Sequence, residues 1–486
     1  MNSAAVSTRE PMGYFSAAAL RAHPERVVEL STTEKFSFAA AELADLQLAA
    51  LQLRFSTLVE TVPVLARFAE EQGLQEISNI ADGALLLLPH TLYKSYPLSA
   101  IEEGRFDRLT RWVGTLTALD LSKVDVQHCA SIDDWIDALD AQSQLRLRHS
   151  SGTTGKLSFI PGSEAETYTA AMGFKRFFQG FGDEPDANVE GVGELPVIGL
   201  GHRRGAMAFA RMLDSIQQHL YCGDGSRIFA SQPGRFSADM LSLGGRLEYA
   251  QSRGELGKLQ LAPALLARRE AFLAEQAEQP RQLQAFFSML NDRFRGQRVI
   301  LTGVVPPVVD TAVAGLARGI EKIFAADSLL FLAGGPKGRK LPPDYPALVE
   351  RFTGVAYPRT GFGMSESASG ITRMCPRGHY HILPNIMPYL LDPQTGRMLP
   401  RSGVQTGRFG FIDIAAQLRW GGFLSGDETT LNFADAAGCG CGRLGTFIDG
   451  EVRRYSEAEG GDDKITCAGA PTVHDNALKF MQDTLQ

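Results

Sequence analysis

The 486-residue sequence has no uninterrupted apolar run of about 18 residues, the length that a membrane-spanning helix requires. It also has no block of lysines and arginines of the kind that binds nucleic acid or a membrane surface, and its formal net charge is −7. We therefore expect neither a nucleic-acid partner nor insertion into a membrane. Arg9 and Glu10 lie where a signal peptide would need an apolar core, so we expect a cytoplasmic protein.

Cysteine is also scarce. The chain has six cysteines, which are too few for a disulfide scaffold. In a reducing compartment, cysteines that cluster are more typical of metal ligands or nucleophiles. Five residues separate Cys375 from His381, and one residue separates Cys439 from Cys441. Three thiolates and one imidazole form the ligand set of a closed tetrahedral zinc site, with His379 as an alternative to His381. Two reduced, partly buried cysteine clusters without metal are the competing interpretation.

The distribution of apolar residues divides the chain into three parts. The N-terminal part has apolar residues at helical spacing. The middle part alternates apolar runs with helical patterns, which predicts an α/β layer of parallel strands and connecting helices. From about residue 380, short runs broken by Gly, Pro and Asp predict a β-rich subdomain. The expected helices cover residues 39–72, 133–144, 163–178, 263–292, 308–324 and 343–352, and the expected strands cover 195–200, 299–305 and 328–332.

Residues 149–156 read HSSGTTGK, a run of hydroxyl and glycine residues that ends in Lys156. The Walker phosphate loop needs four residues between its glycines, but only two separate Gly152 from Gly155, and Leu157 replaces the magnesium-binding hydroxyl. The Walker motif is therefore excluded. The hydroxyl groups, the backbone N–H groups at the glycines and the Lys156 ammonium can still hold a phosphate. A surface hairpin turn is the alternative.

SSGTTGK resembles the signature loop of the adenylate-forming (ANL) superfamily, which includes acyl-CoA ligases, aryl-CoA ligases and acyl-protein synthetases. GGPKG (334–338), YPRTGFGMSES (357–367) and FLSGDETTL (423–431) resemble further motifs of the family and follow in the family's order. The resemblance implies that Glu366 holds Mg²⁺ on ATP and that Asp427 accepts hydrogen bonds from the ribose hydroxyls. It implies Lys156 and Glu366 as catalytic residues. The nucleotide-binding residues that it implies are Ser150, Ser151, Gly152, Thr153, Thr154, Gly155, Lys156, Gly334, Gly335, Pro336, Gly361, Phe362, Gly363, Met364, Ser365 and Asp427.

A fifth segment, GGDDKITCAG (460–469), resembles the family's hinge motif less closely. Asp463 and Ile465 match the motif, but Gly460 stands where arginine is usual. Few residues follow this segment, so the family's C-terminal lysine, which contacts the substrate carboxylate, cannot be assigned. The lysines that could compensate are Lys156, Lys337 and Lys464.

The fold class that we expect is α/β. A large adenylating domain over residues 1–449, with a helical N-terminal part, parallel-sheet α/β layers and the β-rich subdomain, would precede a truncated C-terminal domain over 450–486. The Cys-x5-His and C-x-C-G-R segments are similar to those of some members of the phenylacetate-CoA ligase branch, which favours structural zinc.

The resemblance implies an enzyme that joins a small carboxylic acid to ATP as an acyl- or aryl-adenylate, releases pyrophosphate, and transfers the acyl group to a thiol. CoA is the first candidate for this thiol. An acyl-protein synthetase that uses a carrier thiol and an amide-forming enzyme are alternatives, and a catalytically degenerate nucleotide-binding module is an alternative of another class. The cofactors are then ATP, Mg²⁺ and Zn²⁺, with CoA as acceptor, and homodimer formation is left open.

Overall fold

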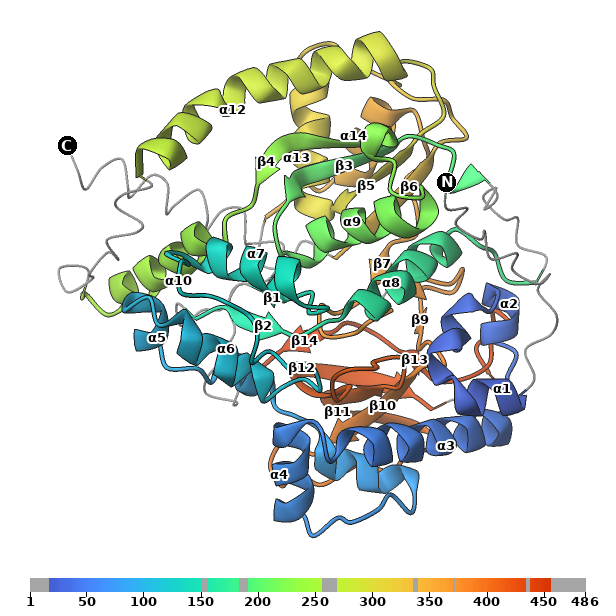
Figure 1. Ribbon diagram of the computed structural model, residues 1–486. Helices are drawn as coiled ribbons and strands as arrows, with labels where there is room; N and C mark the ends of the chain where they lie inside the picture. The colour runs from blue at the N-terminus through green and yellow to red at the C-terminus, as the bar shows by residue number, and fades with distance from the viewer. Residues whose placement is uncertain are drawn as a thin grey trace, which may run out of the picture.

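The computed structural model describes residues 17–150, 156–182, 191–255, 269–334, 340–369, 372–433 and 438–455. Two sheets form its two halves, and helices cover them (Figure 1). The N-terminal helices α3 and α4 lie against the β-rich half, and α12 lies over the other half at the top of the view. The predicted mixed α/β class is therefore confirmed.

The first sheet has six strands in the order β4-β3-β5-β6-β7-β8. All pairs are parallel except β7 with β8. Its central strands are buried because helices cover both faces, which explains why they are near-continuous apolar runs. The strands are β3 (Val197–Arg204), β4 (Ile228–Arg235), β5 (Ile300–Val304), β6 (Leu329–Ala333), β7 (Gly361–Phe362) and β8 (Thr372–Arg373).

The apolar patterns predicted β3, β5 and β6, but β4 and the two-residue strands β7 and β8 were missed. β4 lies at the edge of the sheet, is only partly buried, and contains Pro233 and Gly234. A strand with one neighbour needs no continuous apolar run and tolerates proline, so its sequence gives no strand signal.

The second sheet is antiparallel and begins near residue 380, as predicted. Its order is β10-β11-β12-β13-β9, and β14 also pairs with β12. One face packs on α3 and α4, where Phe55 and Leu65 join Tyr389, Phe411 and Trp420 in one apolar core. The strands are β9 (Tyr380–His381), β10 (Ile386–Leu391), β11 (Val404–Asp413), β12 (Gly422–Asn432), β13 (Phe447–Ile448) and β14 (Arg453–Arg454).

The predicted helices are present with shifts at their ends, of which the largest is in α13, and α6, α9 and α10 were not predicted. The 39–72 segment forms two helices, because Pro63 begins the second one. Ser163 caps α8 as expected, since its hydroxyl accepts the backbone N–H of Glu166 at 3.3 Å. The α-helices are α1 (Ala17–Ala22), α2 (Thr32–Lys35), α3 (Ala40–Leu58), α4 (Pro63–Glu71), α5 (Ser99–Glu102), α6 (Phe106–Gly114), α7 (Ile132–Gln142), α8 (Glu164–Phe177), α9 (Ala208–Leu220), α10 (Ala238–Ser252), α12 (Arg269–Met289), α13 (Val305–Leu316) and α14 (Tyr345–Thr353).

In the described part of the chain, no helix taken singly combines the length and the apolar composition needed to cross a membrane. The bent pair α3 and α4 meets that test only when the two helices are counted together.

A short hairpin, β1 (Arg148–Ser150) with β2 (Ser158–Ile160), flanks the HSSGTTGK segment. Ser150 pairs with Ser158, so the strands on either side of the loop meet as the hairpin interpretation predicted. Residues 151–155 lie outside the described residues.

His149, in this hairpin, is fully buried, and neither ring nitrogen has a hydrogen-bond partner among the described residues. Burial lowers the pKa of His149 to about 3, so the folded protein holds the ring neutral. The unfolded chain binds a proton below about pH 6.5, so folding stability is lost as the pH falls below that value. His149 alone should contribute a loss of about 2 kcal/mol between about pH 7.5 and about pH 5.

We therefore expect His149→Leu to reduce the pH dependence of the free energy of unfolding by about 2 kcal/mol over this interval. Urea unfolding at the two pH values measures the difference. The exposed His128 provides the matched control, since His128→Leu removes an imidazole that folding leaves at the surface. Equal pH dependence in the wild type and His149→Leu would contradict the prediction.

Candidate active site

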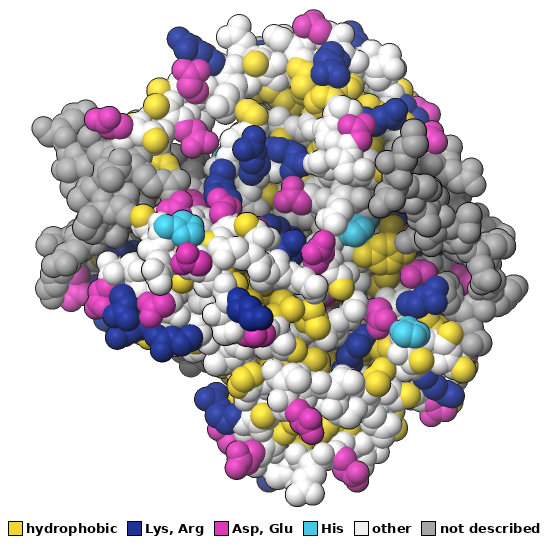
Figure 2. Space-filling view, in the orientation of Figure 1, with side chains coloured by type: hydrophobic (Ala, Val, Ile, Leu, Met, Phe, Trp, Pro, Cys, Tyr) yellow, Lys and Arg dark blue, Asp and Glu magenta, His cyan; other side chains and the backbone are white. Residues whose placement is uncertain are grey.

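A cavity of about 320 Å³ lies at the carboxyl ends of β5 and β6, where they face the loop after β7 and the strand β12. The carboxyl ends of parallel strands are the usual ligand sites of such sheets. Figure 2 shows one face of the molecule in the orientation of Figure 1, and several Lys and Arg side chains gather near its middle. The arginines that line the cavity are Arg146, Arg148, Arg211 and Arg454.

The cavity brings together residues from four of the predicted motifs. Glu366 and Asp427, which are distant in sequence, lie in its wall together with the end of β1 and the end of β6. The predicted site residues that line it are Ser150, Gly334, Gly363, Met364, Ser365, Glu366 and Asp427.

Other predicted residues do not line the cavity or are not described. Gly361 and Phe362 form β7, where Gly361 is buried and the ring of Phe362 packs on Tyr380 at 5.6 Å between centroids. The Lys156 Nζ donates to the Tyr96 carbonyl oxygen at 2.8 Å, and Lys156 is not among the cavity-lining residues. The predicted residues outside the described part are Ser151, Gly152, Thr153, Thr154, Gly155, Gly335, Pro336, Lys337 and Lys464.

Glu366 follows β7 and is half-buried in the cavity wall. Burial raises the pKa of its carboxyl group, and the nearby Arg148 and Arg454 partly oppose this effect. A carboxylate is the hard oxygen ligand that Mg²⁺ prefers, and the Ser365 hydroxyl belongs to the same wall. The residues present therefore fit a magnesium ion held at Glu366.

Asp427, in β12, is buried and forms a two-point ion pair with Arg454 in β14. Arg454 Nε donates to Asp427 Oδ1 at 2.9 Å, and Arg454 Nη2 donates to Oδ2 at 3.3 Å. Each carboxylate oxygen keeps a second lone pair for a further donor. Arg454 therefore places a guanidinium group in the cavity wall beside Asp427.

Sequence reasoning missed Arg454 because β14 is two residues long and gives no strand pattern. The signal that identifies it is the register Asp427↔Arg454 across β12 and β14, which exists only in the folded sheet. Arg148 and Glu166 were missed as well, although both line the cavity. The sequence marks Glu166 only as an acidic residue in the first turn of a helix, and it does lie in the first turn of α8.

Part of the cavity wall beside α8 and α9 is apolar. Phe174 and Phe331 line it together with Phe209 and Met212. Phe174 also packs on Phe178 and Phe331 in the core between α8, α9 and the sheet. The aromatic segment 168–178 therefore serves both as core and as cavity wall.

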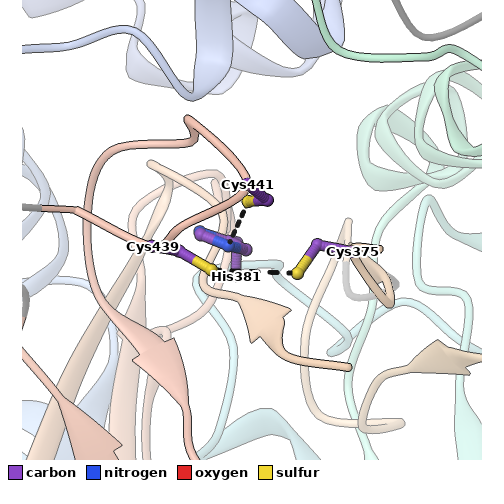
Figure 3. Close-up of side chains that lie close together, drawn as sticks. All are labelled: Cys375, His381, Cys439 and Cys441. Carbon is purple, nitrogen blue, oxygen red and sulfur yellow. Dashed lines mark hydrogen bonds between the residues drawn. The ribbon is translucent and has the colours of Figure 1, made fainter. Parts of the chain in front are cut away.

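The three cysteines and His381 converge at the far end of the β-rich sheet (Figure 3). Cys375 follows β8, His381 belongs to β9, and Cys439 and Cys441 precede β13. One ligand atom from each residue lies within 4.8 Å of the others. The Cys375 Sγ to Cys439 Sγ distance is 4.0 Å, and the Cys441 Sγ to His381 Nε2 distance is 3.3 Å.

The last two distances are close to those of a tetrahedral zinc site. Zn–S bonds of about 2.3 Å and Zn–N bonds of about 2.0 Å place two sulfurs about 3.8 Å apart and a sulfur and a nitrogen about 3.5 Å apart. Burial lowers the pKa of His381 to about 4, which keeps the imidazole in the neutral form that binds metal. His379 lies beside this group, with its Nδ1 3.2 Å from Cys439 Sγ and its ring stacked on Phe447. The four grouped residues include His381 rather than His379.

The fold is that of adenylate-forming enzymes, so the predicted resemblance is confirmed at the level of the fold. The solved structure of a 2-hydroxyisobutyryl-CoA ligase in an open conformation, in complex with 2-HIB-AMP and CoA, has a TM-score of 0.51 and 16% identity, and the match covers 87% of this chain and 77% of that chain. The same ligase in its thioesterification state gives a TM-score of 0.49 at 15% identity, over 86% and 69% of the two chains. ATP-bound MatB from Rhodopseudomonas palustris gives a TM-score of 0.34 at 12% identity, and the match covers 63% of this chain and 47% of that chain. No protein-family model matches the chain, and no curated protein matches it in sequence.

Proposed function

We propose that the protein is an adenylate-forming acid–thiol ligase, which converts a small carboxylic acid and ATP to an acyl-adenylate and pyrophosphate and then transfers the acyl group to a thiol. One observation carries this proposal: Glu366, Asp427, Ser150 and Gly334, from four separate motifs, line one cavity. They do so in a chain that has the fold of these enzymes.

The residues have distinct roles in the proposed first step. Asp427 binds the ribose hydroxyls, and Gly334, at the end of β6, lies beside the adenine. Glu366 holds Mg²⁺, which when bound offsets negative charge on the ATP phosphates. The acid lies with its carboxylate near the α-phosphate and its substituent toward the apolar part of the cavity wall. Most of the rate enhancement then comes from positioning and from fixed charges in a partly buried site.

CoA is the proposed acyl acceptor. The 2-hydroxyisobutyryl-CoA ligase of similar fold was solved with an acyl-adenylate and CoA, which supports this choice. The first step is the same if the acceptor is a protein thiol or an amine. Only the second half-reaction therefore distinguishes these acceptors from CoA. A degenerate nucleotide-binding module is disfavoured, because such a module has no need of a magnesium ligand at Glu366.

We further propose a structural zinc ion at Cys375, His381, Cys439 and Cys441. Four protein ligands leave no open coordination position, so this metal would stabilise the fold rather than take part in chemistry. We also propose that β14 belongs to the adenylating domain, which was expected to end at residue 449, because β14 pairs with β12.

Carboxylate-dependent exchange of radioactive pyrophosphate into ATP tests the first step with a panel of aryl and aliphatic acids. We expect exchange that depends on both Mg²⁺ and the acid, followed by thioester formation when CoA is added. Absence of exchange with every acid, together with intact ATP binding, would instead support the nucleotide-binding module.

Asp427→Asn should raise the KM for ATP about tenfold with a smaller change in kcat, because a hydrogen bond to a charged group contributes about 1.5–3 kcal/mol. The matched control is Glu428→Gln in the same strand. Glu428 pairs with Arg453 and Tyr455 and does not line the cavity, so its loss should leave the KM unchanged. Equal KM values for the two variants would contradict the role of Asp427.

A further inference from the structure

A buried carboxylate in the cavity wall holds two guanidinium groups. Glu166 is 4% exposed, and its oxygens lie 3.4 Å from Arg148 Nη2 and 3.3 Å from Arg419 Nε. Arg419 is 2% exposed and does not line the cavity. Charged groups this deeply buried are costly unless they are paired, so the three side chains form one unit.

Both guanidinium groups also donate to the backbone of the loop that carries Glu366. Arg419 Nη2 donates to the Glu366 carbonyl oxygen at 2.8 Å, and Arg148 Nη1 donates to the Ser367 carbonyl oxygen at 3.0 Å. The buried Asp413 accepts the next backbone group, the Ala368 N–H, at 2.7 Å. Charged side chains therefore fix three consecutive residues of this loop.

These contacts come from distant elements. Arg148 belongs to β1, Glu166 to the first turn of α8, and Arg419 to the turn before β12. The position of the Glu366 backbone thus depends on how the two sheets and α8 meet.

We propose that Glu166 and Arg419 are positioning residues that fix the Glu366 carboxylate for Mg²⁺–ATP. The inference rests on the proposed function. Residues that orient a metal ligand without touching the metal typically change metal affinity or activity about 10- to 100-fold when they are replaced. Neither Glu166 nor Arg419 needs to touch ATP for this effect.

Arg419→Lys is the sharpest test, because lysine keeps the charge but its single ammonium group cannot serve Glu166 and the Glu366 carbonyl in the same geometry. The Kd for ATP is measured by calorimetry in excess MgCl2 and in EDTA. In the wild type, Mg²⁺ should lower the Kd for ATP. In the variant we expect the ratio of the Kd in EDTA to the Kd in MgCl2 to be smaller by about tenfold or more, with an unchanged Kd in EDTA. The matched control is Arg246→Lys, since Arg246 is buried and pairs with Glu102 at 2.8 Å away from the cavity.

Full retention of the Mg²⁺ effect in Arg419→Lys, or equal weakening of both Kd values, overturns the inference and leaves the proposed function in place. If Arg419→Lys does not fold, Glu166→Asp is tested in the same way, because it keeps the charge and withdraws the carboxylate from both arginines. An unchanged Mg²⁺ effect in that variant also overturns the inference. A wild-type protein that binds no ATP overturns both the inference and the proposed function.

Discussion

Replacement of Glu366 by alanine is expected to lower carboxylate-dependent ATP–pyrophosphate exchange by about a hundredfold or more. Glu366 lies in the cavity wall, and its backbone carbonyl oxygen accepts a hydrogen bond from Arg419. Loss of one group that stabilises developing charge typically costs about 3 kcal/mol. The exchange assay at saturating ATP and acid measures the change.

Two further variants give this experiment its controls. Glu366→Gln keeps the size of the side chain and should be nearly as inactive, because a neutral amide is a poor magnesium ligand. Glu321→Ala removes a surface carboxylate that pairs with Arg351 away from the cavity, and should exchange at the wild-type rate. Exchange at the wild-type rate in Glu366→Ala would refute the assignment.

Replacement of Cys439 by serine is expected to remove the bound metal and lower the melting temperature by several degrees or more. The four ligands join the turn after β8, the strand β9 and the loop before β13, and Cys375 and Cys439 are both buried. A structural zinc ion contributes folding free energy directly, so its loss destabilises the segments that it joins. Elemental analysis of protein purified without chelator should give about one zinc per chain in the wild type.

Cys222→Ser is the matched control for Cys439→Ser. Cys222 is exposed and is not one of the four grouped residues, so its replacement should change neither the zinc content nor the melting temperature. Zinc-free wild-type protein, or an unchanged zinc content in Cys439→Ser, would exclude the site.

Much of the candidate site could be predicted from short motifs, because the residue types that contact phosphate, ribose and magnesium are restricted by their chemistry. Glu366 and Asp427 were identified in this way, and both line the cavity. Arg454 was not, since only the pairing of β14 with β12 brings it to Asp427. Lys156 was assigned to the phosphates from its charge, whereas its ammonium group contacts the Tyr96 carbonyl.

The sequence by itself determined the α/β fold class, the order of a parallel-strand layer and a β-rich part, and the cysteines of the candidate metal site, because apolar periodicity and ligand chemistry are local properties. The tertiary structure decided which histidine joins the three cysteines and which arginine meets Asp427. It also decided that Glu166, which its position marks only as a first-turn helix residue, pairs with the partly buried Arg148 and the buried Arg419. Such contacts join residues as far apart as 166 and 419, and packing alone brings them within hydrogen-bonding distance.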